Sequence, residues 1–282
     1  MRSPARCDRI AGGRRASVLA VRGRPVVSLS DRSLDVVALE LPQRFGDRGG
    51  ALAEIDRLIG SPALAGADLV LLPELILTGY VSPRGDSDLR RFAEPIDGES
   101  AERLAELARR HGIALAGPLV EASGGRFYNS LLVFDGDGRR VGHYRKRHPW
   151  FPERWAAPGD LGTPVLELRG IKLTVAICFD VHFVSEDAGD ALDEADLLLF
   201  PTAWVDSPGE GDMRADLLPV LARRHRIAIV NANWGPSRPA LDGQGGSRIL
   251  DARGRSVAAA PPGPGPSAVR ATLRFARERR GT

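Results

Sequence analysis

Apolar positions recur along the chain with two different spacings, which predict helices that alternate with strands. Stripes with the helical period predict three helices, at residues 48–60, 99–111 and 215–226. Gly112 is placed to end the second of these helices. Continuous or alternating apolar runs predict single strands at residues 36–41, 68–74, 113–122, 195–204 and 227–235.

Pairs of strands joined by short turns are predicted in three further places. Residues 128–146 hold two apolar runs separated by the turn sequence DGDG, a strong hairpin signal. A second pair, within residues 163–178, turns at 169–170, and a third spans residues 246–260. Residues 261–266 then form a linker to a last short strand. This order of helices, strands and hairpins favours a mixed α/β sheet structure over a purely parallel one.

The predicted elements define one domain with two irregular ends. No linker divides the chain between its first and last predicted elements, so residues 35–275 are expected to fold as one domain. Residues 1–34 are expected to form a disordered extension, and residues 276–282 a basic tail. Arg14-Arg15 precede a short apolar stretch, but it is too short for a twin-arginine signal, which favours the extension.

The positive charge of the chain is concentrated at its ends. The chain of 282 residues has a net charge of +3 and a pI of about 9.2. Residues 1–24 carry a net charge of +6 and residues 270–282 a net charge of +4, which leaves −7 for residues 25–269. Because no basic stripe crosses this acidic body, nucleic acid is not an expected partner.

Composition also bears on the compartment. No apolar run approaches the roughly 18 residues that a membrane helix needs, so no membrane partner is expected. Two cysteines in 282 residues make a disulfide framework implausible. A reducing compartment, the cytoplasm, is therefore the expected location.

Three polar residues stand at the ends of predicted strands, where the local pattern does not require them: Glu74, Lys146 and Cys178. Functional sites in α/β sheets gather at the carboxyl ends of strands, so the fold could bring these residues together. Taken singly, each has a structural explanation. A lone buried cysteine is usually inert, and the two charged residues could cap a segment or face solvent.

Taken together, the three side chains supply a coherent reaction. The thiolate form of cysteine is a nucleophile. A neighbouring carboxylate can accept the thiol proton, protonate a leaving amine and then activate water. A lysine ammonium can stabilise the oxyanion of a tetrahedral intermediate. The combination predicts hydrolysis of an amide through a thioester.

Three segments carry these residues: "LLPELILTGY" (71–80), "GHYRKRHPWFPE" (142–153) and "VAICFD" (175–180). Their order and spacing resemble the nitrilase superfamily of carbon–nitrogen hydrolases, and the resemblance extends over roughly residues 35–275. It implies a single-domain αββα sandwich with mixed sheets, and a small-molecule amide as substrate. It also implies pairing into a homodimer of stacked αββα–αββα sheets or a larger homo-oligomer, and neither a metal nor an organic cofactor.

The resemblance implies a role for each member of a Glu-Lys-Cys triad. Glu74 would be the general base and acid, Lys146 the oxyanion stabiliser and Cys178 the nucleophile. Glu153 matches a second glutamate that orients the lysine or positions substrate. The backbone N–H of Phe179 would be the other oxyanion donor.

Four side chains are candidates for substrate contact: Tyr80, Trp150, His182 and Trp204. The aromatic ones lie just beyond the triad strands or a neighbouring strand. Such residues belong to the core more often than to a pocket, and a histidine is more often a surface or satisfied residue. Trp204 is the best placed of the four, because "FPTAW" sets it past a strand end.

The segment after Cys178 departs from the pattern of many amidases. Val184 and Ser185 stand where those sequences have Pro and Glu, which leaves the shape of the pocket open. Phe179 and Asp180 favour amides over nitriles, because true nitrilases usually have Trp-Glu there.

Other functions remain as alternatives to amide hydrolysis. Nitrile hydrolysis and acyl transfer could use the same triad, and a catalytically silent member could serve for binding. Metal-dependent hydrolysis is disfavoured, because the five histidines show no H-x-x-x-H spacing. The substrate, and whether it is a primary or secondary amide, stay open at the level of sequence.

Overall fold

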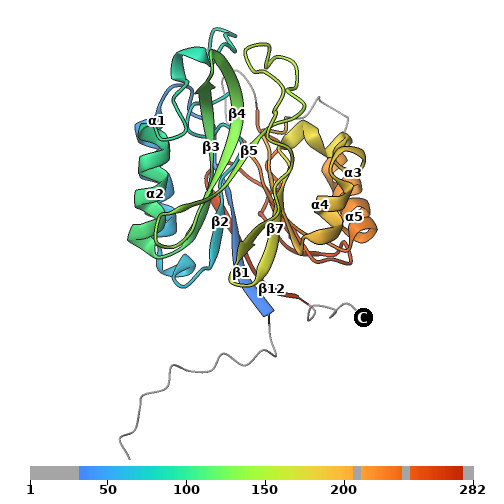
Figure 1. The fold of residues 1–282 in the computed structure, drawn as a ribbon. Coiled ribbons are helices and arrows are strands. Elements are labelled where there is room, and N and C mark those ends of the chain that lie inside the picture. Colours follow the sequence, from blue (N-terminus) through green and yellow to red (C-terminus); the bar gives the residue numbers. More distant parts are fainter. Residues whose placement is uncertain (1–31, 206–210, 237–241, 276–282) are drawn as a thin grey trace, which may run out of the picture. The chain divides into compact units, whose positions relative to one another are not determined.

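The computed structural model describes residues 32–205, 211–236 and 242–275, which form two sheets with helices on their outer faces (Figure 1). All of them belong to one of the two units into which the chain divides, residues 31–282. The predicted tail at 276–282 and all but the last three residues of the predicted extension lie outside the described residues. The first strand begins at Arg32, three residues before the boundary expected at 35.

The first sheet has six strands. In spatial order they are β12 (Ser267–Phe275), β1 (Arg32–Glu40), β2 (Leu69–Leu71), β3 (Ala114–Ser123), β4 (Arg126–Phe134) and β5 (Arg140–Arg145). Strands β1, β2 and β3 are parallel, whereas β12, β4 and β5 join by antiparallel pairing.

The second sheet repeats this plan. In spatial order its strands are β11 (Ser256–Ala259), β10 (Arg248–Leu250), β9 (Ala228–Ala232), β8 (Leu197–Pro201), β7 (Ile171–Val175) and β6 (Leu166–Leu168). Strands β7, β8 and β9 are parallel, and β6, β10 and β11 pair antiparallel. Each sheet is therefore mixed, and the carboxyl ends of its parallel strands share one edge.

Helices make the crossovers that parallel strands require. In the first half of the chain these are α1 (Arg48–Ile59) and α2 (Glu99–His111). In the second half they are α3 (Val184–Asp187), α4 (Gly189–Glu194) and α5 (Met213–His225). Short 3₁₀ turns occur at Pro62–Leu64, Arg90–Phe92 and Cys178–His182.

The apolar side chains separate into three layers. Helices α1 and α2 bury their apolar stripes against the outer face of the first sheet, and α3, α4 and α5 do the same on the second. Between the sheets lies a core to which both inner faces contribute, with members that include Val36, Leu71, Val175, Leu199 and Val230. The predicted αββα sandwich with mixed sheets is thereby confirmed (Figure 1).

Local signals fix where the helices begin and end. The side chain of Asp47 accepts a hydrogen bond from the N–H of Gly50 and caps the start of α1. Gly112 ends α2 in the left-handed conformation, with φ of 63°, which glycine adopts at little cost. The predicted end of that helix is confirmed.

Several predicted strands extend too far: those at 68–74, 195–204 and 227–235 end at Leu71, Pro201 and Ala232. A further one affects the nucleophile candidate. The run "LTVAIC" was expected to stay extended as far as Cys178, but β7 ends at Val175. Cys178 instead begins a 3₁₀ turn and has φ of +46°, a conformation that is uncommon for any residue other than glycine. The nucleophile candidate therefore stands on a tight turn that follows the strand.

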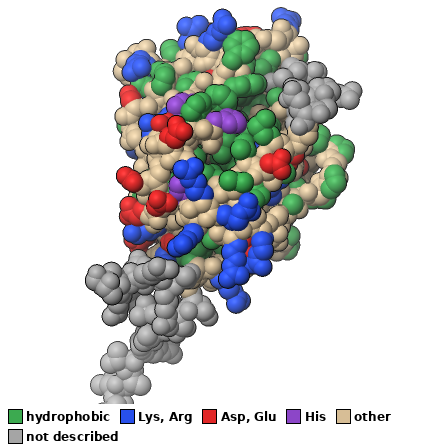
Figure 2. Space-filling model, turned by 90° about the vertical axis from the view of Figure 1, so that its right-hand side faces the viewer, with side chains coloured by type: hydrophobic (Ala, Val, Ile, Leu, Met, Phe, Trp, Pro, Cys, Tyr) green, Lys and Arg blue, Asp and Glu red, His purple; other side chains and the backbone are tan. Residues whose placement is uncertain are grey.

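The surface shown in Figure 2 is the one that faces right in Figure 1. Hydrophobic side chains gather in its upper and middle parts, and several Lys and Arg side chains lie below them. Among the described residues, no helix has the length and apolar character needed to cross a membrane.

Candidate active site

The candidate catalytic residues lie just beyond the ends of strands from both sheets. Glu74 follows β2, and Lys146 comes directly after β5, which runs in the same direction as β3 because both pair antiparallel with β4. Cys178 follows β7 in the other sheet. The fold thus assembles the group from residues that are distant in sequence.

Lys146 lies between two buried carboxylates. Its Nζ atom is 2.7 Å from Oε1 of Glu74 and 2.6 Å from Oε2 of Glu153, and all three side chains are fully shielded from solvent. The amide nitrogen of Asn129 donates to Glu74 at 2.7 Å and to Glu153 at 2.6 Å. Asn129 therefore holds the two carboxylates in register on either side of the ammonium.

Backbone groups complete the surroundings of the carboxylates. The N–H of Ala203, just past β8, donates to Oε2 of Glu74 at 2.9 Å. The indole N–H of Trp234 donates to the backbone carbonyl of Glu74 at 2.8 Å. The N–H of Trp150 donates to Glu153 at 2.6 Å. Residues that follow β8 and β9 of the second sheet thus fix the position of Glu74.

The charges of this cluster do not cancel, because two carboxylates share one ammonium. Burial raises the pKa of Glu74, and Glu153 adds to the rise while Lys146 opposes it. Burial alone would lower the pKa of Lys146, but Glu153 and Glu74 hold it above its usual range. Lys146 therefore stays protonated, and Glu74 is the member suited to exchange a proton.

The thiol of Cys178 is protonated at rest. Burial raises its pKa well above the usual range, and the charge of Glu74 adds to the rise while Lys146 opposes it. A thiol in this state needs a base to become a nucleophile. The raised pKa of Glu74 makes that carboxylate a better proton acceptor than a solvated one.

Asp180 fixes the turn that carries Cys178. Its buried carboxylate accepts hydrogen bonds from the N–H of Ile177 at 3.0 Å, the hydroxyl of Tyr144 at 2.8 Å and the N–H of His148 at 2.8 Å. These bonds join the turn to the end of β5 and the loop beyond it. The uncommon φ of Cys178 is thus supported by contacts on both sides of the residue.

A pocket of about 290 Å³ lies beside Cys178. Residues from three segments of the second half of the chain, together with Trp150, line it: Cys178, Phe179, His182, Ala203, Trp204, Val205 and Met213. Its wall is mostly aromatic and apolar. A substrate held there would lie next to Cys178.

Comparison with known proteins agrees with this fold. The family model described as carbon-nitrogen hydrolase matches residues 36–272. The chain belongs to this family, in the nitrilase superfamily.

Two curated relatives illustrate the range of the family. The "Hydrolase in pqqF 5'region" of Pseudomonas protegens is 33% identical over 61% of this chain and 60% of its own length. The chain thus spans less than two thirds of that relative. An (R)-stereoselective amidase from a Pseudomonas species is 29% identical over 77% of this chain and 78% of its own length.

A solved relative shares the fold of this carbon–nitrogen hydrolase. A structure of the amidase from Nesterenkonia sp. AN1 superposes with a TM-score of 0.75 at 27% identity. It covers 88% of this chain and 94% of the amidase chain.

Three of the four side chains predicted to contact substrate line this pocket. Trp150, His182 and Trp204 line the pocket beside the thiol. Tyr80 does not line it; it is almost completely buried, and its ring packs against those of Trp150 and Trp234. Burial raises the pKa of its hydroxyl, and the nearby Glu153, Glu74 and Cys178 add to the rise. Tyr80 therefore lies beside the candidate catalytic groups, and its contact with substrate stays a prediction.

Several residues of the site were missed by the sequence analysis. Asn129 is a polar residue within a buried apolar run, and that contrast was an available signal. Asp180 was used only to favour amides over nitriles, and its structural role in the turn was missed. Asn233 holds Trp204 through hydrogen bonds to its N–H at 2.7 Å and its carbonyl at 3.2 Å. Nothing in the local pattern marks Met213 as a lining residue.

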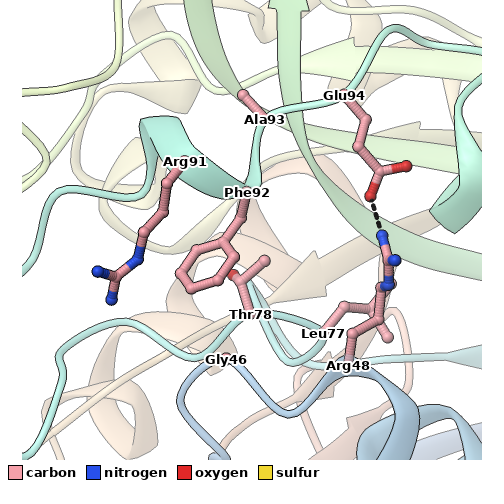
Figure 3. Close-up of a pocket in the computed structure, with 8 residues that line it drawn as sticks. All are labelled: Gly46, Arg48, Leu77, Thr78, Arg91, Phe92, Ala93 and Glu94. Atoms are coloured by element: carbon pink, nitrogen blue, oxygen red, sulfur yellow. Dashed lines mark hydrogen bonds and ion pairs between the residues drawn. The ribbon is translucent and has the colours of Figure 1, made fainter.

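A second pocket, of about 250 Å³, has no such chemistry. It is lined by Gly46, Arg48, Leu77, Thr78, Arg91, Phe92, Ala93 and Glu94. Figure 3 shows Arg48 and Glu94 pointing toward each other, and their ion pair measures 2.5 Å. Arg91 extends away from this pair, with its guanidinium near the ring of Phe92. None of the three triad candidates lines this pocket, so we assign it no part in catalysis.

Proposed function

We propose that this protein hydrolyses a non-peptide amide of a small molecule through a thioester on Cys178, releasing ammonia or an amine. The observation that carries the proposal is the buried cluster in which Lys146 lies between Glu74 and Glu153, next to a protonated thiol that opens into a pocket. A base, an oxyanion donor and a nucleophile are thereby available at one place.

The first half of the reaction forms the thioester. Glu74 accepts the proton of the Cys178 thiol as the sulfur attacks the amide carbon. Lys146 and the backbone N–H of Phe179 stabilise the resulting oxyanion. An ammonium has three N–H donors, and the two carboxylates occupy two of them, which leaves one for the oxyanion among the described contacts. Glu74 then gives its proton to the nitrogen as the C–N bond breaks.

The second half returns the enzyme to its starting state. Glu74, now ionised, accepts a proton from water as the water oxygen attacks the thioester carbon. The C–S bond breaks, the acid leaves, and the proton on Glu74 returns to the sulfur. Lys146 stabilises the oxyanion in both halves, because its pKa keeps it protonated throughout.

A relative supports the role of Cys178 as a nucleophile. A structure of the Nesterenkonia amidase shows covalent addition of the acetamide moiety of fluoroacetamide at its active-site cysteine. Because the acetamide moiety keeps its amide, this adduct is evidence of a nucleophilic cysteine and not of a thioester. The likeness in fold, together with the placement of Cys178, favours a nucleophilic sulfur here. Nitrile hydrolysis and acyl transfer would use the same sulfur and are distinguished by the products.

The test compares the wild-type protein with Cys178→Ala on primary amides, secondary amides, carbamoyl compounds and nitriles. We expect the substitution to lower turnover by at least about 10³-fold, as loss of a covalent nucleophile does elsewhere. Release of ammonia or amine is the measurement, and circular dichroism checks that the variant is folded.

Cys7→Ala is the matched control, because Cys7 is the other cysteine of the chain and lies outside the described residues. It should retain full activity. Comparable turnover in folded Cys178→Ala would refute the thioester mechanism. Product formation from nitriles alone, or only in the presence of an acceptor amine, would replace amide hydrolysis by one of the two alternatives.

A further inference from the structure

The wall of the active-site pocket is a continuous set of rings. Phe179 and His182 have ring centroids 5.0 Å apart, and His182 and Trp204 have centroids 6.0 Å apart. Trp150 and Met213 also line the pocket. Aromatic rings of this kind offer large apolar contact areas and favour offset or edge-on packing with another ring.

The pocket has room for more than the amide group. Its volume is about 290 Å³. An apolar cavity of about 150 Å³ is enough to bind benzene in another protein. A phenyl ring or an alkyl chain of similar size therefore fits beside the group that reacts with Cys178.

The polar groups near the wall are already engaged or uncharged. Partial burial lowers the pKa of His182, so its imidazole is neutral at neutral pH. Arg214 lies behind Trp204, with its guanidinium 5.9 Å from the ring centroid, and donates to Asn231, Gln244 and the carbonyl of Gly245. The described lining thus offers apolar contact and no charged partner.

We infer that the pocket selects an uncharged amide that carries an apolar group, preferably an aromatic one, and discriminates against amides with an ammonium or carboxylate on that group. This inference rests on the amide hydrolysis proposed above. An apolar group gains by leaving water against the rings, whereas a charged group loses its hydration there.

The first experiment compares four primary amides that differ only beyond the reacting group: 3-phenylpropanamide, hexanamide, 5-aminopentanamide and glutaric acid monoamide. We expect kcat/KM for the phenyl compound to exceed that for either charged compound by at least about tenfold, since apolar pockets discriminate on this scale. Equal or higher kcat/KM for a charged amide would overturn the inference and leave amide hydrolysis standing.

A second experiment changes the wall itself. Met213 is half exposed at the first position of α5, so Met213→Glu adds a carboxylate to the pocket without burying it in the core. Acidic residues are tolerated well at helix N-termini. We expect Met213→Glu to lower kcat/KM for 3-phenylpropanamide by about fivefold and to raise it for 5-aminopentanamide by a similar factor, because a nearby charge pair is worth about 1 kcal/mol.

Val220→Glu is the matched control. Val220 is also an exposed apolar residue of α5, but it does not line the pocket. Its substitution should leave both rates unchanged. If Met213→Glu and Val220→Glu have the same effect, the wall does not select the substrate and the inference fails.

Binding separates this inference from the proposed function. Binding of the four amides to Cys178→Ala can be measured by calorimetry without turnover. Preferential binding of 3-phenylpropanamide would support the selectivity even without hydrolysis. If the wild-type protein hydrolysed none of the four amides, that lack of turnover would count against the proposed amide hydrolysis and not against the selectivity. Binding without preference would overturn the selectivity.

Discussion

Two carboxylates and one ammonium meet at the active site with no exposure to solvent. An ion pair this deeply buried loses its hydration, and additional hydrogen bonds must offset the loss. Here Asn129 donates to both carboxylates, and backbone N–H groups of Ala203 and Trp150 donate to one each. The arrangement leaves one negative charge in excess, and the raised pKa of Glu74 is the consequence.

Removing the charge of Glu153 tests this coupling. In Glu153→Gln we expect the acidic limb of the pH profile of kcat/KM to move to lower pH. The charge of Glu153 helps to raise the pKa of Glu74, and the reaction needs Glu74 ionised. We also expect kcat to fall by up to about 100-fold, because Lys146 loses one of the partners that position it.

The measurement is kcat/KM across the acidic range in the wild-type protein and the variant. Glu167→Gln is the control, since Glu167 is an exposed carboxylate on β6, and its profile should match that of the wild-type protein. An acidic limb that stays in place in Glu153→Gln would mean that Glu74 is not the titrating base.

At the scale of elements, a buried histidine joins the three helices of the second half of the chain. The Nε2 atom of His225 on α5 is 2.9 Å from the hydroxyl of Ser185 on α3, and its Nδ1 atom is 2.7 Å from a carboxylate oxygen of Asp193 on α4. Ser185 stands where many amidases have Glu. The departure noted in the sequence therefore has a structural role: it ties the helix that follows the Cys178 turn to α5.

Ser185→Ala tests this role. The substitution leaves a nitrogen of His225 without its hydrogen-bond partner, so we expect the free energy of unfolding to fall by about 1 kcal/mol. Denaturant titration of the variant and of Ser256→Ala, an exposed serine on β11, gives the comparison. If Ser185→Ala is as stable as that control, the hydrogen bond between Ser185 and His225 does not stabilise the fold.

The elements that the sequence predicted well are those with a strong local pattern. Helix α2 combines a clear apolar stripe with a terminal glycine, and the DGDG turn defines the β4–β5 hairpin. Helices α3 and α4, of 4 and 6 residues, were not predicted because they are too short to show a period. The end of β7 was placed too late because Ala176 and Ile177 continue the apolar run, while the turn depends on the distant Tyr144 and His148.

The site itself was predictable only in part. Glu74, Lys146 and Cys178 were nominated because a polar residue at a strand end is conspicuous and because the motifs around them resemble a family. Asn233 and Met213 enter through packing between elements that no local pattern records. Tyr80 is not part of the described pocket lining, but its hydroxyl lies near Glu153 and Cys178, a placement that its position next to a strand end could not reveal.

In the molecule as a whole, the candidate active site also connects the two sheets. At the other end of the strands, Arg32 of β1 forms an ion pair of 2.5 Å with Asp196, which precedes β8, and Arg169 pairs with Asp68, which precedes β2. At the carboxyl ends, Glu74 accepts the N–H of Ala203 from the second sheet. The cluster of Glu74, Lys146 and Glu153 therefore contributes to the cohesion of the sandwich as well as to the proposed chemistry.

This double role predicts a stability defect that depends on pH when the ammonium is removed. In Lys146→Met, the carboxylates of Glu74 and Glu153 stay buried without a counter-ion. We expect the free energy of unfolding to fall by about 3–5 kcal/mol at neutral pH, as when one partner of a buried pair is removed. Lys172→Met, which removes a partly exposed partner of Glu194, should lower it by no more than about 1 kcal/mol.

The sign of the pH dependence follows from the raised pKa of Glu74, which burial lifts and Lys146 normally restrains. Without Lys146 the pKa rises further above the unfolded value of about 4.3. At low pH the carboxyl of Glu74 is protonated in the folded protein, and its burial then lowers the free energy of unfolding only slightly. The free energy of unfolding falls as the pH rises through the pKa that Glu74 has in the folded protein. Lys146→Met should therefore approach the wild-type stability near pH 4 and diverge from it toward pH 8 in denaturant titrations. An equal loss of free energy of unfolding at both pH values would mean that the variant is destabilised by lost packing around the lysine side chain and not by uncompensated charge.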